Sequence, residues 1–350
     1  MNNNEFEIAG QKIGHGRPVY IIAEMSANHN QDFEQAVALI KAAKDSGADA
    51  IKLQTYTPDT ITLDVDTPPF RIEGTIWNGQ TLHSLYAKAY TPWEWFPRLQ
   101  KIAKDEGLDF FSSPFDPTAV EFLESLAVPA YKVASFELVD LPLLELIAHT
   151  GKPIIMSTGM ASLAEIDEAI QAIRNTGNNQ LALLKCTSAY PAPLEEMNLK
   201  TMPHIAATFG VHVGISDHTM DSVVPVAATA LGAAIIEKHL TLSRSVNGPD
   251  SSFSMEPAEF ERMVQAVRET EKSLGQISYE VTEQQRACKF YRRSLFAVQD
   301  IRQGEEITSL NVRSIRPGNG LHPRFLHKII GKNARVNIAK GTPLEWNLLD

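Results

Sequence analysis

Short apolar runs alternate with longer segments of helical character along the first 275 residues. In residues 32–47, for example, apolar positions recur at helical spacing and the segment closes on Gly47. The runs between such segments are typical of strands. This alternation predicts eight strands, over residues 19–25, 49–55, 108–114, 130–135, 152–159, 181–187, 211–217 and 233–240.

Strands joined by crossover helices form a parallel sheet. Eight such units in about 275 residues have the size and count of a (β/α)8 barrel. The predicted fold class is therefore α/β, with a TIM barrel first. An open, doubly wound sheet is the alternative, which the lack of a G-x-G-x-x-G motif after the first strand weakens. The long connection 56–92 is expected to be an ordered loop over the barrel top.

The pattern changes after Gly275. Residues 276–292 are predicted to be a linker. Residues 293–350 contain short strand-like runs separated by the turns QGE, RPGNG and KGT, which predicts a small, mostly β domain. The predicted division is therefore 1–275, 276–292 and 293–350, and the last piece is small enough that docking on a partner is plausible.

Composition excludes several classes of protein. The 43% hydrophobic and 21% charged content is ordinary for a globular chain with a sizeable core. The polar N-terminus, the lack of long apolar runs and the presence of only two cysteines favour a cytoplasmic protein without a membrane segment or a disulfide framework. The net charge of −10 argues against a nucleic-acid binder.

The charge is unevenly distributed. Residues 293–350 hold 9 Lys+Arg against 5 Asp+Glu, or +4, which leaves −14 for the remainder of the −10 total. This is either a chance feature of a short segment or a basic domain that supplies a cation to an anionic ligand.

Polar side chains lie at the carboxyl ends of all eight predicted strands. They are Glu24, Lys52, Gln54, Ser112, Ser113, Lys132, Ser135, Glu137, Ser157, Thr158, Thr187, Ser188, Tyr190, Ser216, Asp217, His218, Glu237 and His239. Barrel enzymes build their active sites at this face from several strand ends. The pattern predicts a catalytic site there.

These residue types suggest an anionic ligand and a metal. The cations of Lys52 and Lys132 suit a phosphate and a carboxylate, together with the hydroxyls of Ser113, Ser135, Ser157 and Ser216. The imidazoles of His218 and His239 end adjacent strands, so they suit a divalent cation that also binds water or a substrate oxygen. The alternative is two unrelated strand-end histidines.

Glu24 ends the first predicted strand. It is a candidate general base or a water-mediated partner of the metal. A salt bridge inside the barrel mouth is the alternative reading.

Motifs along nearly the whole chain resemble one family. IIAEMSANHN, IKLQTY, SSPFD, YKVAS, STGM, LLKCTSAYP, GISDHT, IEKHLT and GPD occur in that order and resemble the sialic acid synthase (NeuB-like) family. RRSL, RPGNG and KGTPLEWN resemble that family's C-terminal antifreeze-like (SAF) domain. A series of about a dozen motifs is far more specific than any one of them.

This resemblance implies an activity, a cofactor and a partner. Family members condense phosphoenolpyruvate with an N-acylated amino sugar, giving a nine-carbon 2-keto-3-deoxy acid and phosphate. The resemblance also implies a divalent metal ion, Mn²⁺ first, with Mg²⁺ or Co²⁺ as alternatives. It further implies a domain-swapped homodimer in which the antifreeze-like domain of one chain covers the barrel mouth of the other.

The resemblance also assigns roles to residues. It implies that His218 and His239 bind the metal and that Glu24 is the essential acid. Phosphoenolpyruvate would bind Lys52, Ser113, Lys132, Ser135, Ser157 and Ser216, and the sugar would bind Gln54, Glu137, Tyr190 and Asp250. Arg316 of RPGNG would reach in from the partner chain, which would give the basic tail a purpose.

Two departures from the N-acetylneuraminate pattern resemble the pseudaminic acid synthase branch. Ser188 in CTSAYP stands where asparagine is common, and GPDSSFSMEP lacks the basic series H-K-A-S after GPD. The implied substrate is 2,4-diacetamido-2,4,6-trideoxy-L-altrose, a 6-deoxy sugar. Phe253 is either an apolar wall for its C6 methyl group or a core phenylalanine.

Other functions remain open from sequence. Within the family, the alternatives are an N-acetylneuraminate, legionaminate or spore-coat polysaccharide synthase. Outside it, they are a non-catalytic carbohydrate-binding protein and an aldolase that uses Lys132 as a Schiff base. The intact set of site residues argues against the former, and the paired histidines and the tail argue against the latter.

Overall fold

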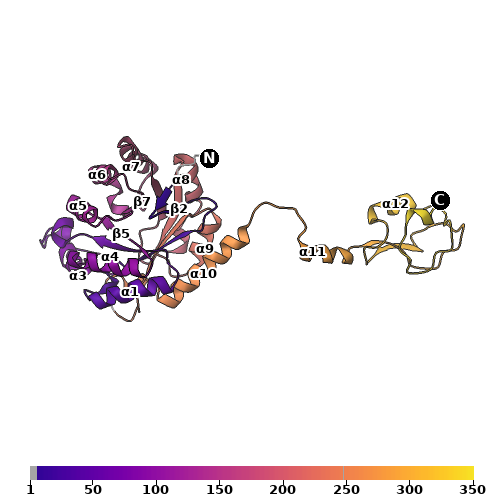
Figure 1. The fold of residues 1–350 in the computed structure, drawn as a ribbon, viewed down its shortest axis with the longest axis horizontal. Coiled ribbons are helices and arrows are strands. Elements are labelled where there is room, and N and C mark those ends of the chain that lie inside the picture. Colours follow the sequence, from indigo (N-terminus) through magenta and orange to yellow (C-terminus); the bar gives the residue numbers. More distant parts are fainter. Residues whose placement is uncertain (1–5, 247) are drawn as a thin grey trace. The chain divides into compact units, whose positions relative to one another are not determined.

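The computed structural model describes residues 6–246 and 248–350 (Figure 1). The chain divides into two compact units, Met1–Gly275 and Gln276–Asp350, and each is described by itself.

The first unit is a closed barrel of eight parallel strands. Its strands are β3 (Tyr20–Glu24), β4 (Ala50–Thr55), β5 (Asp109–Pro114), β6 (Tyr131–Val133), β7 (Ile154–Ser157), β8 (Leu181–Cys186), β9 (His212–Asp217) and β10 (Ile235–His239). They neighbour one another in chain order, and β10 pairs with β3 to close the ring. The predicted barrel is thus confirmed, and the open-sheet alternative is wrong.

Helices surround the strands (Figure 1). They are α1 (Phe33–Asp45), α4 (Phe96–Asp105), α5 (Pro117–Ser125), α6 (Leu141–His149), α7 (Leu163–Asn175), α8 (Thr201–Phe209), α9 (Val223–Ala230) and α10 (Pro257–Leu274). In α1, the buried residues Ala36, Leu39, Ile40 and Ala43 recur at helical spacing and join the barrel core. Asp32 caps this helix by accepting hydrogen bonds from two backbone N–H groups of its first turn.

A short hairpin precedes the barrel and was not predicted. It pairs β1 (Phe6–Ile8) with β2 (Gln11–Ile13), and its apolar side chains join the barrel core. The ring of Phe6 lies 5.9 Å from that of His212 at the start of β9. The hairpin therefore packs at the amino ends of the strands, away from the predicted site.

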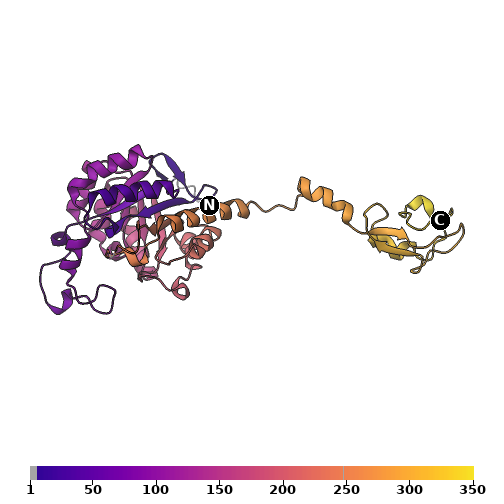
Figure 2. The same ribbon diagram turned by 90° about the horizontal axis from the view of Figure 1, so that it is seen from below.

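The long connection after β4 is ordered, as expected. It carries α2 (Pro58–Ile61) and α3 (Leu82–Ala89). Figure 2 shows this indigo-to-purple segment extending beyond the ring of helices. The indole Nε1 of Trp77 donates to the carbonyl of Pro249 at 2.9 Å, so the connection is tied to the loop that follows β10.

The second unit is small and built around an antiparallel pair of strands. It contains α11 (Glu283–Cys288), β11 (Ser294–Ala297), β12 (Val312–Ile315) and α12 (Leu326–Ile329). Isolated bridges such as Ile301 to Ile338 extend the pairing around a core of its own. Helix α11 lies within the segment that was predicted to be a linker. In the described part of the chain, no helix is both long and apolar enough to cross a membrane.

Candidate active site

The centre of the site is a buried ammonium group between two carboxylates. Lys52 Nζ on β4 lies 2.5 Å from Glu24 Oε2 on β3 and 3.6 Å from Glu237 Oε1 on β10. It also donates to Ser113 Oγ at 3.2 Å. The salt bridge considered for Glu24 is therefore present. Through its contacts with Glu24 and Glu237, Lys52 links β3 and β10, the two strands that meet where the barrel closes.

The two carboxylates differ in their tendency to hold a proton. Burial raises the pKa of Glu24 to about 7, with Glu237 adding to the effect and Lys52 opposing it. Burial also works to raise the pKa of Glu237, but Lys132 and Lys52 hold that pKa below its usual value. Ser216 Oγ donates to Glu237 Oε1 at 3.4 Å. Such a split typically separates a proton-transfer group from a permanently charged one.

A second buried lysine lies two strands further round the barrel, on the far side of β5. Lys132 Nζ on β6 donates to Ser157 Oγ on β7 at 2.7 Å and to the carbonyl of Val133 at 2.7 Å. Both Lys132 and Lys52 are almost completely buried. Two ammonium groups with serine hydroxyls beside them match the chemistry of a ligand that carries both phosphate and carboxylate.

Gly159 leaves space beside the β7 end. A Cβ atom there would lie 2.2 Å from Ser188 Oγ and 2.7 Å from Ser135 Oγ. The Gly159 N–H donates to Ser135 Oγ at 3.1 Å. The hydroxyls of Ser188 and Ser135 therefore occupy the space that a side chain at Gly159 would need.

The two predicted metal histidines converge. Their ring centroids lie 5.5 Å apart. His218 Nδ1 lies 3.0 Å from the carbonyl of Thr187, which can only accept, so in the neutral ring Nδ1 carries the proton and Nε2 is the nitrogen open to a ligand. Burial works to lower the pKa of His218, but contacts with Cys186 and the Thr187 carbonyl raise it above its usual value. Burial, followed by the charges of His218 and Lys52, lowers the pKa of His239 well below its usual value. Neutral imidazole is the form that binds metal.

The histidine pair fits a metal ion in part. Among the described residues, His239 Nδ1 is buried without a hydrogen-bond partner, as expected of a nitrogen that awaits a ligand or a water. No group of three or more His, Cys, Asp or Glu arranged for a metal is found in residues 6–246 and 248–350. Two histidines therefore supply part of a coordination sphere and leave the other positions to water and substrate oxygen.

Aromatic rings pack against the histidines. Tyr190 lies 4.4 Å from His218 and 4.9 Å from Phe253, between ring centroids, and Phe253 lies 5.1 Å from His239. Trp77 lies 5.8 Å from Tyr190. Phe253 is only 2% exposed, whereas Tyr190 and Trp77 are half-buried. Phe253 is thus a buried ring that packs against Tyr190 and His239. This position fits a core phenylalanine at least as well as an apolar wall for the C6 methyl group of the sugar.

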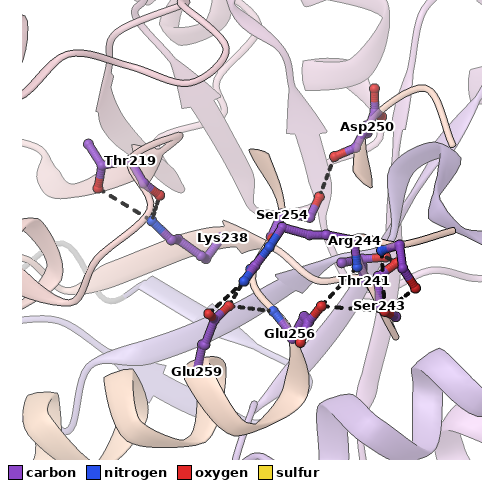
Figure 3. A network of polar contacts seen from close by, with 10 residues as sticks. Thr219, Lys238, Thr241, Ser243, Arg244, Asp250, Ser254, Glu256 and Glu259 are labelled. Carbon is purple, nitrogen blue, oxygen red and sulfur yellow. Dashed lines mark hydrogen bonds and ion pairs between the residues drawn. The ribbon is translucent and has the colours of Figure 1, made fainter. Parts of the chain in front are cut away.

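The loop after β10 carries Asp250 and Phe253 and is held by a polar network (Figure 3). The guanidinium of Arg244 donates to Glu259 Oε1 at 2.8 Å and to the carbonyl of Ser254 at 3.2 Å. Ser254 Oγ in turn donates to the carbonyl of Asp250 at 2.7 Å. The carboxylate of Asp250 accepts hydrogen bonds from Ser26 Oγ and from the Ala27 N–H. This places Asp250 beside the loop that follows Glu24.

The remaining predicted residues are placed less centrally. Gln54 is half-buried and pairs in register with Ser113. Glu137 lies in the 3-10 helix Ser135–Val139, and burial raises its pKa to about 7. Arg316 is exposed directly after β12 in the second unit, so the described geometry of the first unit does not include it.

Glu237 and Trp77 contact residues of the site but were absent from the predicted set. Glu237 was noted at a strand end but given no role, although it lies two positions before His239 and so shares its strand face. Trp77 lies in the long connection that was expected over the barrel top, but no periodicity there singles out an individual residue. A cavity of about 770 Å³ lies beside Trp77, and none of the described residues that line it belongs to the predicted set.

Comparisons with known proteins agree with this geometry. The NeuB family matches residues 39–279, and the SAF domain matches residues 292–350. Pseudaminic acid synthase of Helicobacter pylori is 46% identical over 94% of this chain and 97% of that protein. Pseudaminic acid synthase of Campylobacter jejuni serotype O:23/36 is 45% identical over 94% of this chain and 96% of its own length.

A solved structure also covers nearly the full length. The spore coat polysaccharide biosynthesis protein SpsE of Bacillus subtilis superposes with a TM-score of 0.68 at 34% identity, over 99% of this chain and 99% of its own. The barrel, the buried lysine centre and the paired histidines thus occur in a chain that belongs to the NeuB family and ends in a SAF domain.

Proposed function

We propose that this chain is a pseudaminic acid synthase. It condenses phosphoenolpyruvate with 2,4-diacetamido-2,4,6-trideoxy-L-altrose and releases pseudaminic acid and phosphate. The observation that carries the proposal is the pairing of two buried lysines with two converging histidines in one barrel mouth. The 45–46% identity to two pseudaminic acid synthases supports this substrate.

Phosphoenolpyruvate binds at the lysine centre. Lys52 and Lys132 neutralise its phosphate and carboxylate, and the hydroxyls that share the hydrogen bonds of these lysines reorient toward its oxygens. These two hydroxyls belong to Ser113 and Ser157. Ser135, which accepts from the Gly159 N–H, and Ser216, which donates to Glu237, supply further hydroxyls for the ligand. Because the ammonium groups are buried, their attraction for the anion is stronger than it would be in water.

His218 and His239 would hold the divalent ion, which we propose to be Mn²⁺. Its binding there would supply Lewis-acid chemistry at the aldehyde oxygen of the open-chain sugar. The hydrogen bond of His218 Nδ1 to Thr187 orients the ring so that Nε2 is the ligand nitrogen.

Glu24 acts on the water that adds to C2 of phosphoenolpyruvate. With a pKa raised to about 7, this carboxylate is a better proton acceptor than an exposed glutamate. Lys52, which lies 2.5 Å away, keeps the carboxylate oriented and stabilises the charge on the departing phosphate. Glu237 stays ionised and balances the two lysines.

The sugar binds between β4, β6, β8 and the loop after β10. Gln54, Glu137, Ser188, Tyr190 and Asp250 supply its polar contacts. The rings of Tyr190 and Trp77, backed by Phe253, form an apolar surface suited to the C6 methyl group of a 6-deoxy sugar.

The partner is a second copy of the chain. In the proposed domain-swapped homodimer, which we place in the cytoplasm, Arg316 of one chain completes the site of the other. Equal amounts of the separately inactive variants Glu24→Gln and Arg316→Ala, after subunit exchange, should recover about a quarter of wild-type activity, because half the dimers are mixed and each has one intact site. Without exchange they should stay inactive. If Arg316 instead acts on the site of its own chain, every site carries one of the two substitutions and no activity is recovered.

Phosphate release tests the substrate. The enzyme is incubated with phosphoenolpyruvate and Mn²⁺, with either the trideoxy-altrose or N-acetylmannosamine as acceptor. We expect phosphate release with the trideoxy-altrose, because the aromatic surface accepts a methyl group but leaves a C6 hydroxyl unpaired. Phosphate release with N-acetylmannosamine alone would assign the chain to N-acetylneuraminate synthesis. Release with neither acceptor would favour the amino sugar of a legionaminate or spore-coat polysaccharide synthase, or a carbohydrate-binding protein without activity.

A further inference from the structure

A buried ion pair lies directly behind the two histidines. Lys238 Nζ on β10 lies 2.6 Å from Asp217 Oδ2 on β9, and both side chains are almost completely inaccessible. The two residues are register partners, and each directly precedes a histidine, His239 and His218 respectively. The ion pair therefore joins the two strand ends that carry the histidines.

Thr219 completes this arrangement on the far side of His218. The Lys238 ammonium donates to the carbonyl of Thr219, as seen in Figure 3. Asp217 accepts from the Thr219 N–H at 2.9 Å and from its hydroxyl at 3.1 Å. The residues before and after His218 are thus held by a single lysine of the neighbouring strand. We call Lys238, Asp217 and Thr219 the clamp.

The clamp does not contact the reacting groups. Glu237 reaches the lysine centre inside the barrel, and successive side chains of a strand point to opposite faces. Lys238 therefore points away from the barrel interior, whereas Glu237 and His239 share the inward face of β10. The backbone of His239 is fixed as well, because its carbonyl accepts from the Met255 N–H at 2.9 Å.

Stability alone is a weak explanation for such a pair. Burying two charges is costly, and well-packed apolar replacements of buried ion pairs are often neutral or stabilising. A buried pair is better suited to fixing one geometry, because its hydrogen bonds are directional and costly to leave unmade.

We propose that the clamp sets the separation and orientation of His218 and His239, so that Lys238 and Asp217 are positioning residues for metal binding. The proposal rests on the metal role of the two histidines given above. Mutation of a residue that holds a metal ligand in place typically weakens metal binding by about 10–100-fold.

The test measures Mn²⁺ binding without turnover, by the electron paramagnetic resonance signal of free Mn²⁺ in titrations of the full chain. Lys238→Met leaves Asp217 buried and unpaired, so it is expected to lower the melting temperature strongly. The double variant Lys238→Met/Asp217→Asn replaces both charges and should melt cooperatively. For the double variant we expect a Kd for Mn²⁺ about 10–100-fold higher than that of the wild type.

A kinetic readout separates positioning from a general loss of structure. At saturating Mn²⁺, the KM of the double variant for phosphoenolpyruvate should stay within about twofold of wild type, because Lys52 and Lys132 are untouched.

The matched control is Arg268→Met. Arg268 pairs with Asp49 at 3.3 Å and donates to the carbonyl of Val19, both at the amino ends of the strands. It should lower stability but leave Mn²⁺ affinity unchanged.

Two outcomes would overturn the proposal, and they are distinguishable. If the wild type binds Mn²⁺ and the folded double variant binds it within about twofold, the clamp has no positioning role. If the wild type itself binds no Mn²⁺, the metal role of the histidines fails, and the clamp proposal fails with it.

Discussion

Replacing Glu24 by glutamine is expected to lower kcat by about 10²–10⁴-fold, the range that one proton-transfer group contributes. The amide keeps the size of the side chain but cannot accept a proton from the attacking water. The KM for phosphoenolpyruvate should change much less, since both lysines remain. Steady-state phosphate release at saturating substrates measures the effect.

The pH profile gives this prediction a second readout. Because the ionised carboxylate is the active form, kcat of the wild type should rise with pH and level off above a pKa of about 7. The charged groups that face Glu24 are Lys52, Glu237 and Lys132. The residual activity of the glutamine variant should lack this rise.

Glu124→Gln, which alters a carboxylate paired with Lys152 at the barrel exterior, is the control. An unchanged kcat in Glu24→Gln would remove Glu24 from the chemistry.

Replacing His239 by glutamine is expected to abolish metal-dependent turnover, with a loss of about 10³-fold or more. Among the residues that the structure describes, this imidazole is one of two that converge in the site, so its loss leaves a single histidine to hold the ion. We expect Mn²⁺ to raise the melting temperature of the wild type in the absence of substrates, and we expect this stabilisation to disappear in the variant.

His149→Gln provides the comparison for this histidine. His149 ends α6, is exposed, and should tolerate the change with full Mn²⁺ stabilisation and activity. If His239→Gln keeps both, the metal lies elsewhere. If it keeps Mn²⁺ stabilisation but loses activity, His239 acts on the substrate instead.

The sequence predicted the barrel because parallel strands that are buried on both faces give uninterrupted apolar runs. All eight runs contain the observed strands, and errors are confined to their ends. Residues 130–135, for example, overlap the strand Tyr131–Val133, after which the 3-10 helix begins at Ser135. The hairpin of residues 6–13 escaped prediction because each of its strands has only three residues and its stability comes from tertiary packing.

Site residues were predictable where strand direction alone determines position. Parallel strands end at one face, so Lys52, Lys132 and the two histidines had to lie near one another. Side-chain pairing was not predictable. The choice of Glu237 as a second partner for Lys52, and the burial of Phe253 behind His239, depend on packing between segments far apart in the chain.

The closure of the barrel by β3 and β10 has a consequence for how the protein is made. During synthesis, Lys52 and Glu24 leave the ribosome roughly 200 residues before His239, at about 5–20 residues per second. Until His239 has been made, a nascent chain lacks one of the two histidines and the strand that closes the ring. A metal ion at the proposed site can therefore stabilise only the closed barrel, which it favours by binding the folded state and not its precursors.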